Sequence, residues 1–339
     1  MINNIALAGC GNVGTALLEL LHDKQDELRE KYGFEFKVVL ISDLMKGVVM
    51  NAEGLDLDAV LAALHERRSF SGFMQAAQPF DELLHESGAT ILAECTPTDL
   101  KTGGAGLSHL RSALARGISV ATTNKGPLAV AFDELTHTAE ECGARLAYEG
   151  VVMSGTPLID MVKNGIAGCS VLGFEGILNG TTNFILTKMG EGATYADALI
   201  EATSLGYAEA DPSGDVEGWD AAVKVAILSK IIYGKEVQVK DITRIGITQI
   251  TPRQIEEARK AGFAIKLIAG VRFDSFGMHP YVMPKEISLA SPLASINGAT
   301  NAITIQTDNL GDITISGPGA GRRETAQALL GDMIRMGSH

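Results

Sequence analysis

The chain has 339 residues, of which 46% are hydrophobic and 20% are charged, and its formal net charge is −13 at pH 7. This length is sufficient for two domains with well-buried cores, and the composition is ordinary for a globular protein. The acidic balance argues against nucleic acid or an anionic membrane as a partner, because both attract a basic surface.

We expect no targeting or membrane segment in this chain. Its first residues enter an apolar run without a basic leader, and no apolar run reaches the length of a membrane span. The four cysteines are far apart and form no CxxC pair, so we expect reduced thiols and no zinc site. These features predict a cytoplasmic protein.

The first expected elements are a strand over residues 2–8 and a helix over residues 15–21. Between them lies the run Gly9-Cys10-Gly11-Asn12-Val13-Gly14. A GxGxxG run between a strand and a helix is the fingerprint of dinucleotide binding. The first glycine forms the turn, the second admits the pyrophosphate, and the third lets the helix pack on the strand. We therefore expect residues 9–14, Asn12 and Val13 included, to hold NAD or NADP.

The second strand is expected over residues 36–41 and is followed by Ser42 and Asp43. A carboxylate at this point accepts a hydrogen bond from the 2′-hydroxyl of the adenosine ribose, which favours NAD over NADP. Lys46 follows closely and offers a positive charge to the 2′-phosphate of NADP instead. Asp43 also fits a plain turn residue, so the choice between the two cofactors stays open.

Strands and helices then alternate up to residue 148. The expected strands cover 90–95, 118–121 and 144–148, and the expected helices cover 56–66, 107–116 and 128–142. This alternation predicts an α/β domain with an open, doubly wound parallel sheet of the Rossmann type. Lys125 follows the strand over 118–121, at the carboxyl end where ligands bind in such sheets.

The regular alternation stops after Glu149. A turn-rich junction over 150–157 leads into helices over 158–164, 182–189, 196–205 and 216–232, and into strands over 170–178, 264–273, 302–307 and 312–316. This mixture predicts a separate α+β domain. A second glycine-rich turn at 317–321 opens a terminal helix. We therefore expect residues 1–150 with 317–339 to form the nucleotide-binding domain and residues 151–316 to form the other.

Residues 206–224, GYAEADPSGDVEGWDAAVK, place several carboxylates ahead of one lysine. Asp220 and Lys224 are four residues apart on the expected helix, so they share a face and can pair. Carboxylates around an ammonium orient a lysine and tune it for proton transfer. A solvated acidic loop beside a surface ion pair is the alternative. The aliphatic residues on both sides of Lys224 favour a cleft wall instead.

This segment resembles the substrate-site segment of homoserine dehydrogenases. Residues 176–189, GILNGTTNFILTKM, resemble a signature of the same family, and the likeness extends from the fingerprint to the terminal helix. It implies NAD(P)-dependent interconversion of L-homoserine and L-aspartate 4-semialdehyde in threonine, methionine and isoleucine biosynthesis. It also implies a homodimer formed through the α+β substrate domain, and a short form without ACT or aspartokinase domains.

The resemblance assigns roles to individual residues. Lys224 is the proton donor supported by Asp215 and Asp220, and Glu209 contacts the amino acid substrate. Lys125 lies beside substrate and cofactor and stabilises the developing alkoxide, although the two lysines can exchange roles. The cofactor contacts implied beyond residues 9–14 and Asp43 are Thr96, Thr123, Lys125, Gly206 and Gly321.

The resemblance further implies a structural sodium ion. Its ligands would be Glu149, Val152, Ser154 and Thr156, in the segment EGVVMSGTP. Met153, Ser154 and Thr156 stand where the family usually has smaller residues. The site survives this departure if its ligands are mostly backbone carbonyls.

Two other functions fit the same residues. The chain can be another NAD(P)-dependent dehydrogenase of a small amino acid such as aspartate. It can also be a cofactor-sensing regulator that keeps the fold without catalysis. The joint presence of Lys125, Glu209, Asp215, Asp220 and Lys224 favours an enzyme, because a lapsed enzyme should have lost some of them.

Overall fold

The computed structural model describes residues 2–66, 69–70, 73 and 78–337. The chain divides into two compact units, Met1–Gly155 with Gly321–His339 and Thr156–Ala320. The division falls a few residues beyond the expected boundaries at 150 and 316. One reason is that helix α7 (Gly150–Met153) packs against helix α14 (Arg322–Gly337) and so belongs to the first unit.

The first unit is built on a six-stranded sheet with the order β3-β2-β1-β4-β5-β6. Its strands are β1 (Ile2–Ala8), β2 (Glu35–Asp43), β3 (Gly47–Met50), β4 (Ile91–Glu94), β5 (Ser119–Thr122) and β6 (Leu146–Ala147). The prediction of a parallel sheet is correct except at one edge, where β3 runs antiparallel to β2. A short turn through the exposed Leu44 and Met45 reverses the chain there.

Helices cover both faces of this sheet. They are α1 (Asn12–Asp23), α2 (Gln25–Tyr32), α3 (Leu57–Glu66), α4 (Phe80–Glu86), α5 (Gly104–Leu114), α6 (Lys125–Glu141), α7 and α14. In β1, Ile5 and Leu7 belong to one core with α1, α3 and α14, whereas Ala6 and Ala8 belong to a second core with α4, α5 and α6. Successive side chains of a strand point to opposite faces, so the unit is doubly wound as predicted.

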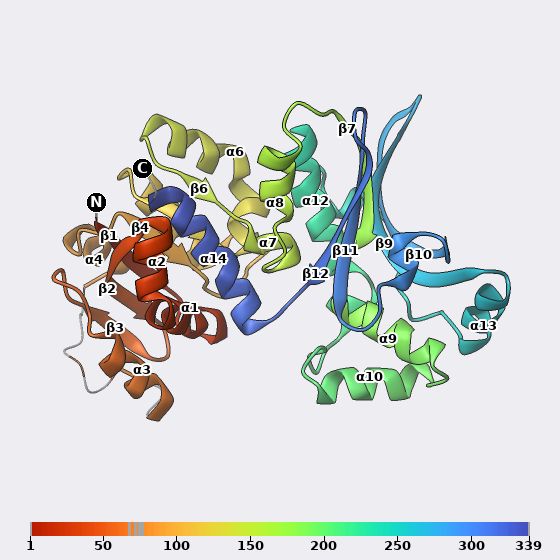
Figure 1. Ribbon diagram of the computed structural model, residues 1–339, viewed down its shortest axis with the longest axis horizontal. Coiled ribbons are helices and arrows are strands. Elements are labelled where there is room, and N and C mark those ends of the chain that lie inside the picture. The colour runs from red at the N-terminus through yellow and green to blue at the C-terminus, as the bar shows by residue number, and fades with distance from the viewer. Residues whose placement is uncertain (1, 67–68, 71–72, 74–77, 338–339) are drawn as a thin grey trace. The chain divides into compact units, whose positions relative to one another are not determined.

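The terminal helix α14 lies beside α1 at the other end of the sequence (Figure 1). Arg322 pairs with Glu19, and Arg323 pairs with Asp23 at 3.1 Å. The first turn of α14 is thereby held to α1, the helix that follows the glycine-rich run.

The second unit has its own six-stranded sheet, with the order β12-β11-β7-β9-β10-β8. Its strands are β7 (Val171–Ile177), β8 (Thr243–Arg244), β9 (Phe263–Asp274), β10 (Gly277–Ser288), β11 (Thr300–Thr307) and β12 (Gly311–Pro318). All neighbours pair antiparallel except β8 and β10. Strand β10 was not expected, because Pro280 and Pro284 interrupt a strand pattern. It nevertheless pairs with β9 along its whole length.

The helical segments of the second unit are α8 (Leu158–Asp160), a π-helical turn (Met161–Gly165), α9 (Gly180–Gly190), α10 (Tyr195–Ser204), α11 (Ser213–Val216), α12 (Trp219–Tyr233) and α13 (Pro252–Lys260), with short 3₁₀ turns at Val239–Asp241 and Pro292–Ser295. Helices α9, α12 and α13 pack against the central strands. Within the described ranges, no helix is long and apolar enough to cross a membrane.

The expected helix over 216–232 is wrong at its start. Gly218 adopts a left-handed conformation with a φ of 83°, which ends the short helix α11 and lets α12 begin at Trp219. Pro212 is the N-cap of α11, and Ser213 and Gly214 belong to this short helix. A glycine tolerates this backbone conformation, whereas a side chain at Gly218 would also press on Val282.

A buried lysine in the second unit ties β9 to α9. Lys266 is 3% exposed, and its ammonium donates to Asn183 Oδ1 at 3.2 Å, to Asn297 Oδ1 at 3.1 Å and to the carbonyl of Ile296. Asn183 in turn donates to the carbonyls of Ile296, Gly298 and Thr300. Burial lowers the pKa of Lys266 to about 8.

The stability of the wild type relative to Lys266→Met should therefore rise with pH. The pKa of this lysine is about 8 in the folded protein and 10.5 in the absence of burial. Between these values the unfolded chain binds more protons than the folded one, which makes unfolding less favourable as pH rises. A shift of this size corresponds to about 3 kcal/mol. Denaturant unfolding of both proteins across this pH range measures the difference between their free energies of unfolding. A difference that stays constant with pH would refute the prediction.

Candidate active site

The three glycines of the GxGxxG run have different surroundings. Gly9 has a φ of 87°, and a Cβ there would lie 2.7 Å from the carbonyl oxygen of Cys95. A Cβ on Gly14 would overlap the carbonyl oxygen of Gly9. No heavy atom lies within 4 Å of the position that a Cβ on Gly11 would take. Gly9 thus makes the turn, Gly14 permits close packing, and Gly11 leaves open space, as predicted from the spacing.

The open space at Gly11 borders the amino end of α1. This helix has Gly11 as its N-cap, with no side chain capping it and no acidic residue in its first turn. Amide groups at such an end favour an anion, both as hydrogen-bond donors and through the helix dipole. The residues present therefore fit a dinucleotide pyrophosphate.

Asp43 lies at the carboxyl end of β2 and contacts the glycine-rich run directly. Its Oδ2 accepts from the backbone N–H of Cys10 at 2.8 Å, and its Oδ1 accepts from the N–H groups of Met45 at 2.9 Å and Lys46 at 3.0 Å. The ammonium of Lys46 donates to the carbonyl of Cys10. A carboxylate and an ammonium thus lie at the same loop, and both features expected to decide between NAD and NADP are in place.

Thr96, Thr123 and Lys125 come together at the carboxyl ends of β4 and β5. Thr96 donates to Glu94 through its hydroxyl and through its N–H, the latter at 3.0 Å. The N–H of Thr123 donates to the carbonyl of Glu94 at 3.2 Å. Lys125 is the first residue of α6 and is half-buried. Thr96 and Thr123 therefore contact one acidic residue, Glu94, and Lys125 follows on the same segment after β5.

Sequence reasoning missed Glu94, which is 0% exposed. Thr122 Oγ1 also donates to its carboxylate at 3.0 Å, and Asn124 Nδ2 donates to the carbonyl of Thr96 at 3.2 Å. A carboxylate buried among hydrogen-bond donors holds both loops in place. The only signal in the sequence was one acidic residue in the apolar run TILAEC.

Gly321 opens α14 in the first unit. Its φ is 140°, and a Cβ there would overlap the carboxylate of Glu324. Its carbonyl accepts from Thr325 N at 3.1 Å and from Thr325 Oγ1 at 2.7 Å. The turn therefore needs a glycine whether or not it contacts a cofactor.

Lys224 lies in the second unit and is 6% exposed. Its ammonium pairs with Asp220 Oδ2 at 2.9 Å and donates to the carbonyl of Leu178 at 2.6 Å. The pairing of Asp220 with Lys224 along one helix face is present as predicted. Because the lysine is buried, the alternative of an ion pair on an open surface is wrong.

Asp215 joins this cluster through an asparagine that the sequence reasoning did not single out. Asn179 Nδ2 donates to Asp215 Oδ1 at 2.6 Å and to Asp220 Oδ2 at 3.1 Å. Burial raises the pKa of Asp215 above its ordinary value, the hydrogen bond from Asn179 opposes this rise, and the charge of Asp220 adds to it. The sequence signal that could have indicated Asn179 was its place in the run GILNGTTNF. That run served only to recognise the family, and no role was assigned to its asparagine.

Gly206 and Glu209 lie on an exposed loop between α10 and α11. Gly206 has a φ of 77°, a conformation that favours glycine. Glu209 is exposed and is not among the residues described above around Lys224. Its predicted contact with substrate therefore stays a prediction.

The segment expected to bind sodium is buried. Glu149 is 5% exposed and its N–H donates to Asp332 Oδ2 at 3.0 Å; Val152 is also buried. Ser154 has a φ of 52° and its hydroxyl lies 2.7 Å from that of Thr325. Thr156 Oγ1 donates to the carbonyl of Pro318 at 3.2 Å. Among the residues that the structure describes, no cluster of His, Cys, Asp and Glu could hold a metal. A sodium ion would need backbone carbonyls here.

A family described as homoserine dehydrogenase matches residues 157–334, and the NAD binding domain of homoserine dehydrogenase matches residues 9–149. The chain is 42% identical over 338 residues to the NAD(+)-dependent homoserine dehydrogenase of Pseudomonas canavaninivorans, covering 98% of this chain and 95% of that one. The chain belongs to the homoserine dehydrogenase family. The resemblance inferred from the acidic segment and the signature is thereby confirmed.

Two further relatives agree with this assignment to the homoserine dehydrogenase family. The homoserine dehydrogenase of Methanocaldococcus jannaschii is 36% identical over 336 residues, covering 98% of both chains. A solved hyperthermophilic archaeal homoserine dehydrogenase in complex with NADPH superposes with a TM-score of 0.84 at 32% identity, covering 99% of this chain and 98% of that one. The chain is an NAD(P)-dependent oxidoreductase with the Rossmann-type domain and second domain of homoserine dehydrogenases.

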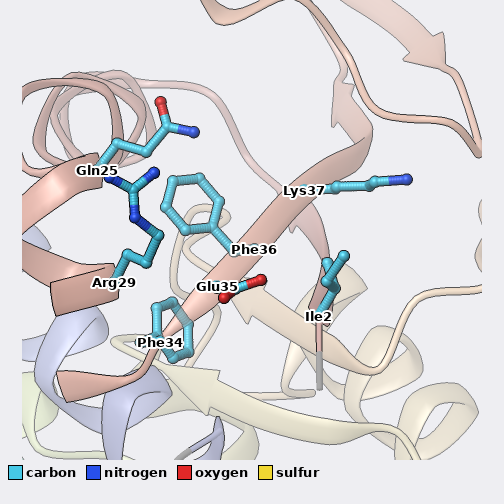
Figure 2. A pocket seen from close by; sticks show the side chains of 7 residues that line it. All are labelled: Ile2, Gln25, Arg29, Phe34, Glu35, Phe36 and Lys37. Carbon is cyan, nitrogen blue, oxygen red and sulfur yellow. The ribbon is translucent and has the colours of Figure 1, made fainter.

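The first unit also contains a cavity of about 200 Å³ (Figure 2). It is lined by Ile2, Gln25, Arg29, Phe34, Glu35, Phe36 and Lys37. Ile2 and Glu35 begin β1 and β2, whereas the glycine-rich run follows the end of β1. The cavity is therefore at the amino ends of the parallel strands, opposite the edge where such sheets bind cofactors.

Proposed function

We propose that the chain interconverts L-homoserine and L-aspartate 4-semialdehyde with NAD or NADP. The observation that carries this proposal is the buried lysine Lys224, fixed by Asp220 and by the carbonyl of Leu178, in a chain that also has the complete dinucleotide fingerprint. Family membership supports the choice of substrate. A second dehydrogenase reaction has no observation in its favour.

In the proposed reaction, residues 9–14 and the amino end of α1 hold the pyrophosphate, and Asp43 or Lys46 meets the adenosine ribose. The bound nicotinamide supplies the hydride acceptor or donor. The ammonium of Lys224 gives a proton to the C4 oxygen when the aldehyde is reduced, and its neutral amine takes that proton when homoserine is oxidised. Asp220 and the carbonyl of Leu178 hold the group in position. Lys125 supplies positive charge for the alkoxide, and Glu209 pairs with the substrate ammonium.

The test is turnover by the purified chain, followed at the absorbance band of reduced nicotinamide. Homoserine and aspartate are each supplied with NAD and with NADP. Turnover with homoserine alone supports the proposal, and turnover with aspartate alone supports the other dehydrogenase. Cofactor binding without turnover of any small amino acid or aldehyde would identify a cofactor-sensing regulator.

We expect NAD to serve at least as well as NADP, and Asp43→Ala to raise the NADP-to-NAD ratio of kcat/KM about tenfold, or ~1.4 kcal/mol. The carboxylate accepts from a ribose hydroxyl but repels a 2′-phosphate. Its position on the glycine-rich run, 2.8 Å from Cys10 N, supports this role. Steady-state kinetics with both cofactors measure the ratio.

Lys46→Ala is the matched control for Asp43→Ala, because its ammonium contacts the same residue, Cys10. Removal of this charge should lower kcat/KM with NADP and leave kcat/KM with NAD nearly unchanged. A wild type that strongly prefers NADP, with that preference unaltered in Asp43→Ala, would show that Asp43 is only a turn residue.

We also propose a cytoplasmic homodimer that associates through the second unit. The family resemblance supports the dimer, and exposed apolar side chains on this unit offer contact area. These side chains include Leu172, Phe273, Phe276, Leu289 and Leu310. The four cysteines are free, as expected in a reducing compartment. Light scattering at several concentrations decides the oligomeric state.

The sodium ion remains part of the proposal. Glu149, Val152, Ser154 and Thr156 would hold it largely through backbone carbonyls, which are ligands that hard cations accept. Unfolding temperatures in sodium, potassium and choline chloride at equal ionic strength test this directly. Equal temperatures in all three salts would argue against a sodium site.

A further inference from the structure

Asn179 uses every polar atom of its side chain at one junction between elements. It is the N-cap of α9, where its Oδ1 accepts from Thr182 N at 2.9 Å and from Thr182 Oγ1 at 2.9 Å. Its Nδ2 faces the opposite way and donates to Asp215 and Asp220 at 2.6 and 3.1 Å. Because the Thr182 N–H can only donate and ionised carboxylates can only accept, the orientation of the amide is determined.

The two carboxylates need a shared donor at this point. Asp215 is flanked by the charged groups Asp220 and Lys224, both on α12, and by the neutral side chains of Asn179 and Thr181. Two carboxylates at one site repel each other, and one of them tends to bind a proton. The amide of Asn179 has two N–H groups and gives one to each carboxylate. Without this donor, the repulsion between the two carboxylates would favour protonation of one of them and weaken the hold of Asp220 on Lys224.

We propose that Asn179 is a positioning residue, whose side-chain amide bridges Asp215 and Asp220 and so keeps Asp220 available to orient Lys224. This inference rests on the proposed role of Lys224 in proton transfer. It assigns to Asn179 a function beyond capping a helix. The adjacent carbonyl of Leu178 accepts directly from Lys224, so the turn from β7 to α9 contacts the lysine as well as its carboxylate partner.

Asn179→Asp separates the bridging role from the capping role. Aspartate is as good an N-cap as asparagine, so the start of α9 is preserved. The change removes the donor and adds a third carboxylate beside Asp215 and Asp220. We expect turnover to fall about 10- to 100-fold, as when the supporting partner of a functional group is lost. We also expect the acid limb of the pH dependence of the turnover number to move about one pH unit higher. The activity of the variant should therefore partly recover as the pH rises.

Asn183→Asp is the matched control. Asn183 lies one turn further along α9 and also donates its amide, but to the carbonyls of Ile296, Gly298 and Thr300. The same isosteric change there should alter stability and leave the acid limb in place. The NAD dissociation constant and the unfolding midpoint, measured for both variants, show whether either has lost its fold.

Wild-type turnover and an unshifted acid limb in Asn179→Asp would overturn the inference. A loss of activity in both variants with equal acid limbs would reduce Asn179 to a structural residue. Failure of the wild type to turn over homoserine would refute the proposed function instead. In that case, NMR titration of ¹³C-labelled aspartate still tests the bridge, because the pKa of Asp215 should rise in Asn179→Ala but not in Asn183→Ala.

Discussion

Lys224→Ala is expected to lower the turnover number about 100- to 10,000-fold, the usual cost of losing a general acid or base. The lysine is buried, and its ammonium is held by Asp220 at 2.9 Å and by Leu178 O at 2.6 Å, so no solvent-exposed group can replace it in position. The cofactor dissociation constant should stay close to that of the wild type, because the predicted cofactor residues belong to the first unit, with the exception of Gly206. Stopped-flow turnover and cofactor titration measure the two quantities.

Three further variants make this result specific. Lys125→Ala should lower turnover and also weaken substrate and cofactor binding, and Asp220→Asn should give an intermediate loss because the lysine is present but poorly held. Lys260→Ala removes another lysine from an i,i+4 ion pair, with Glu256 at 2.7 Å, and should have no effect because that pair is exposed. Near-normal turnover in Lys224→Ala would make Lys125 the leading proton donor.

Gly11→Ala is expected to weaken NAD binding about 100-fold or more, or ~2.7 kcal/mol, while leaving the unfolding midpoint nearly unchanged. No heavy atom lies within 4 Å of the new methyl group, and the φ of Gly11 is −74°, so neither a clash nor a left-handed φ opposes the change. The methyl would nevertheless occupy the space through which the pyrophosphate approaches the amide groups of α1. Isothermal titration with NAD and thermal unfolding measure the two effects.

Gly14→Ala is the comparison for that experiment. Its Cβ would overlap the carbonyl oxygen of Gly9 and lie 3.2 Å from Cys95 Sγ, so both stability and cofactor binding should fall. Unchanged NAD affinity in Gly11→Ala would place the pyrophosphate elsewhere and contradict the proposed use of the glycine-rich run.

The features that the sequence determined by itself are local ones. The spacing of the GxGxxG run predicts a role for each of its glycines, because each role depends on residues within one strand, one turn and one helix. The pairing of Asp220 with Lys224 likewise follows from helix geometry, which places residues four apart on the same face. The alternation of strands and helices along the first unit predicted its doubly wound sheet. Strands and helices can be told apart in the sequence because their side chains repeat with different periods.

Only the tertiary structure decided which partners complete the site. Asn179 and the carbonyl of Leu178 lie more than thirty residues before Asp215, and Glu94 contacts Thr122 from another strand. Contacts of this kind depend on the turn that connects β7 to α9 and on the pairing of β4 with β5. No local period encodes them. The same reason explains why β10 was not predicted. Its prolines weaken the local strand pattern, but its pairing with β9, which is a tertiary contact, makes it a strand. The sequence likewise could not show that Lys224 is buried and held in one position, because desolvation of a side chain depends on the packed fold.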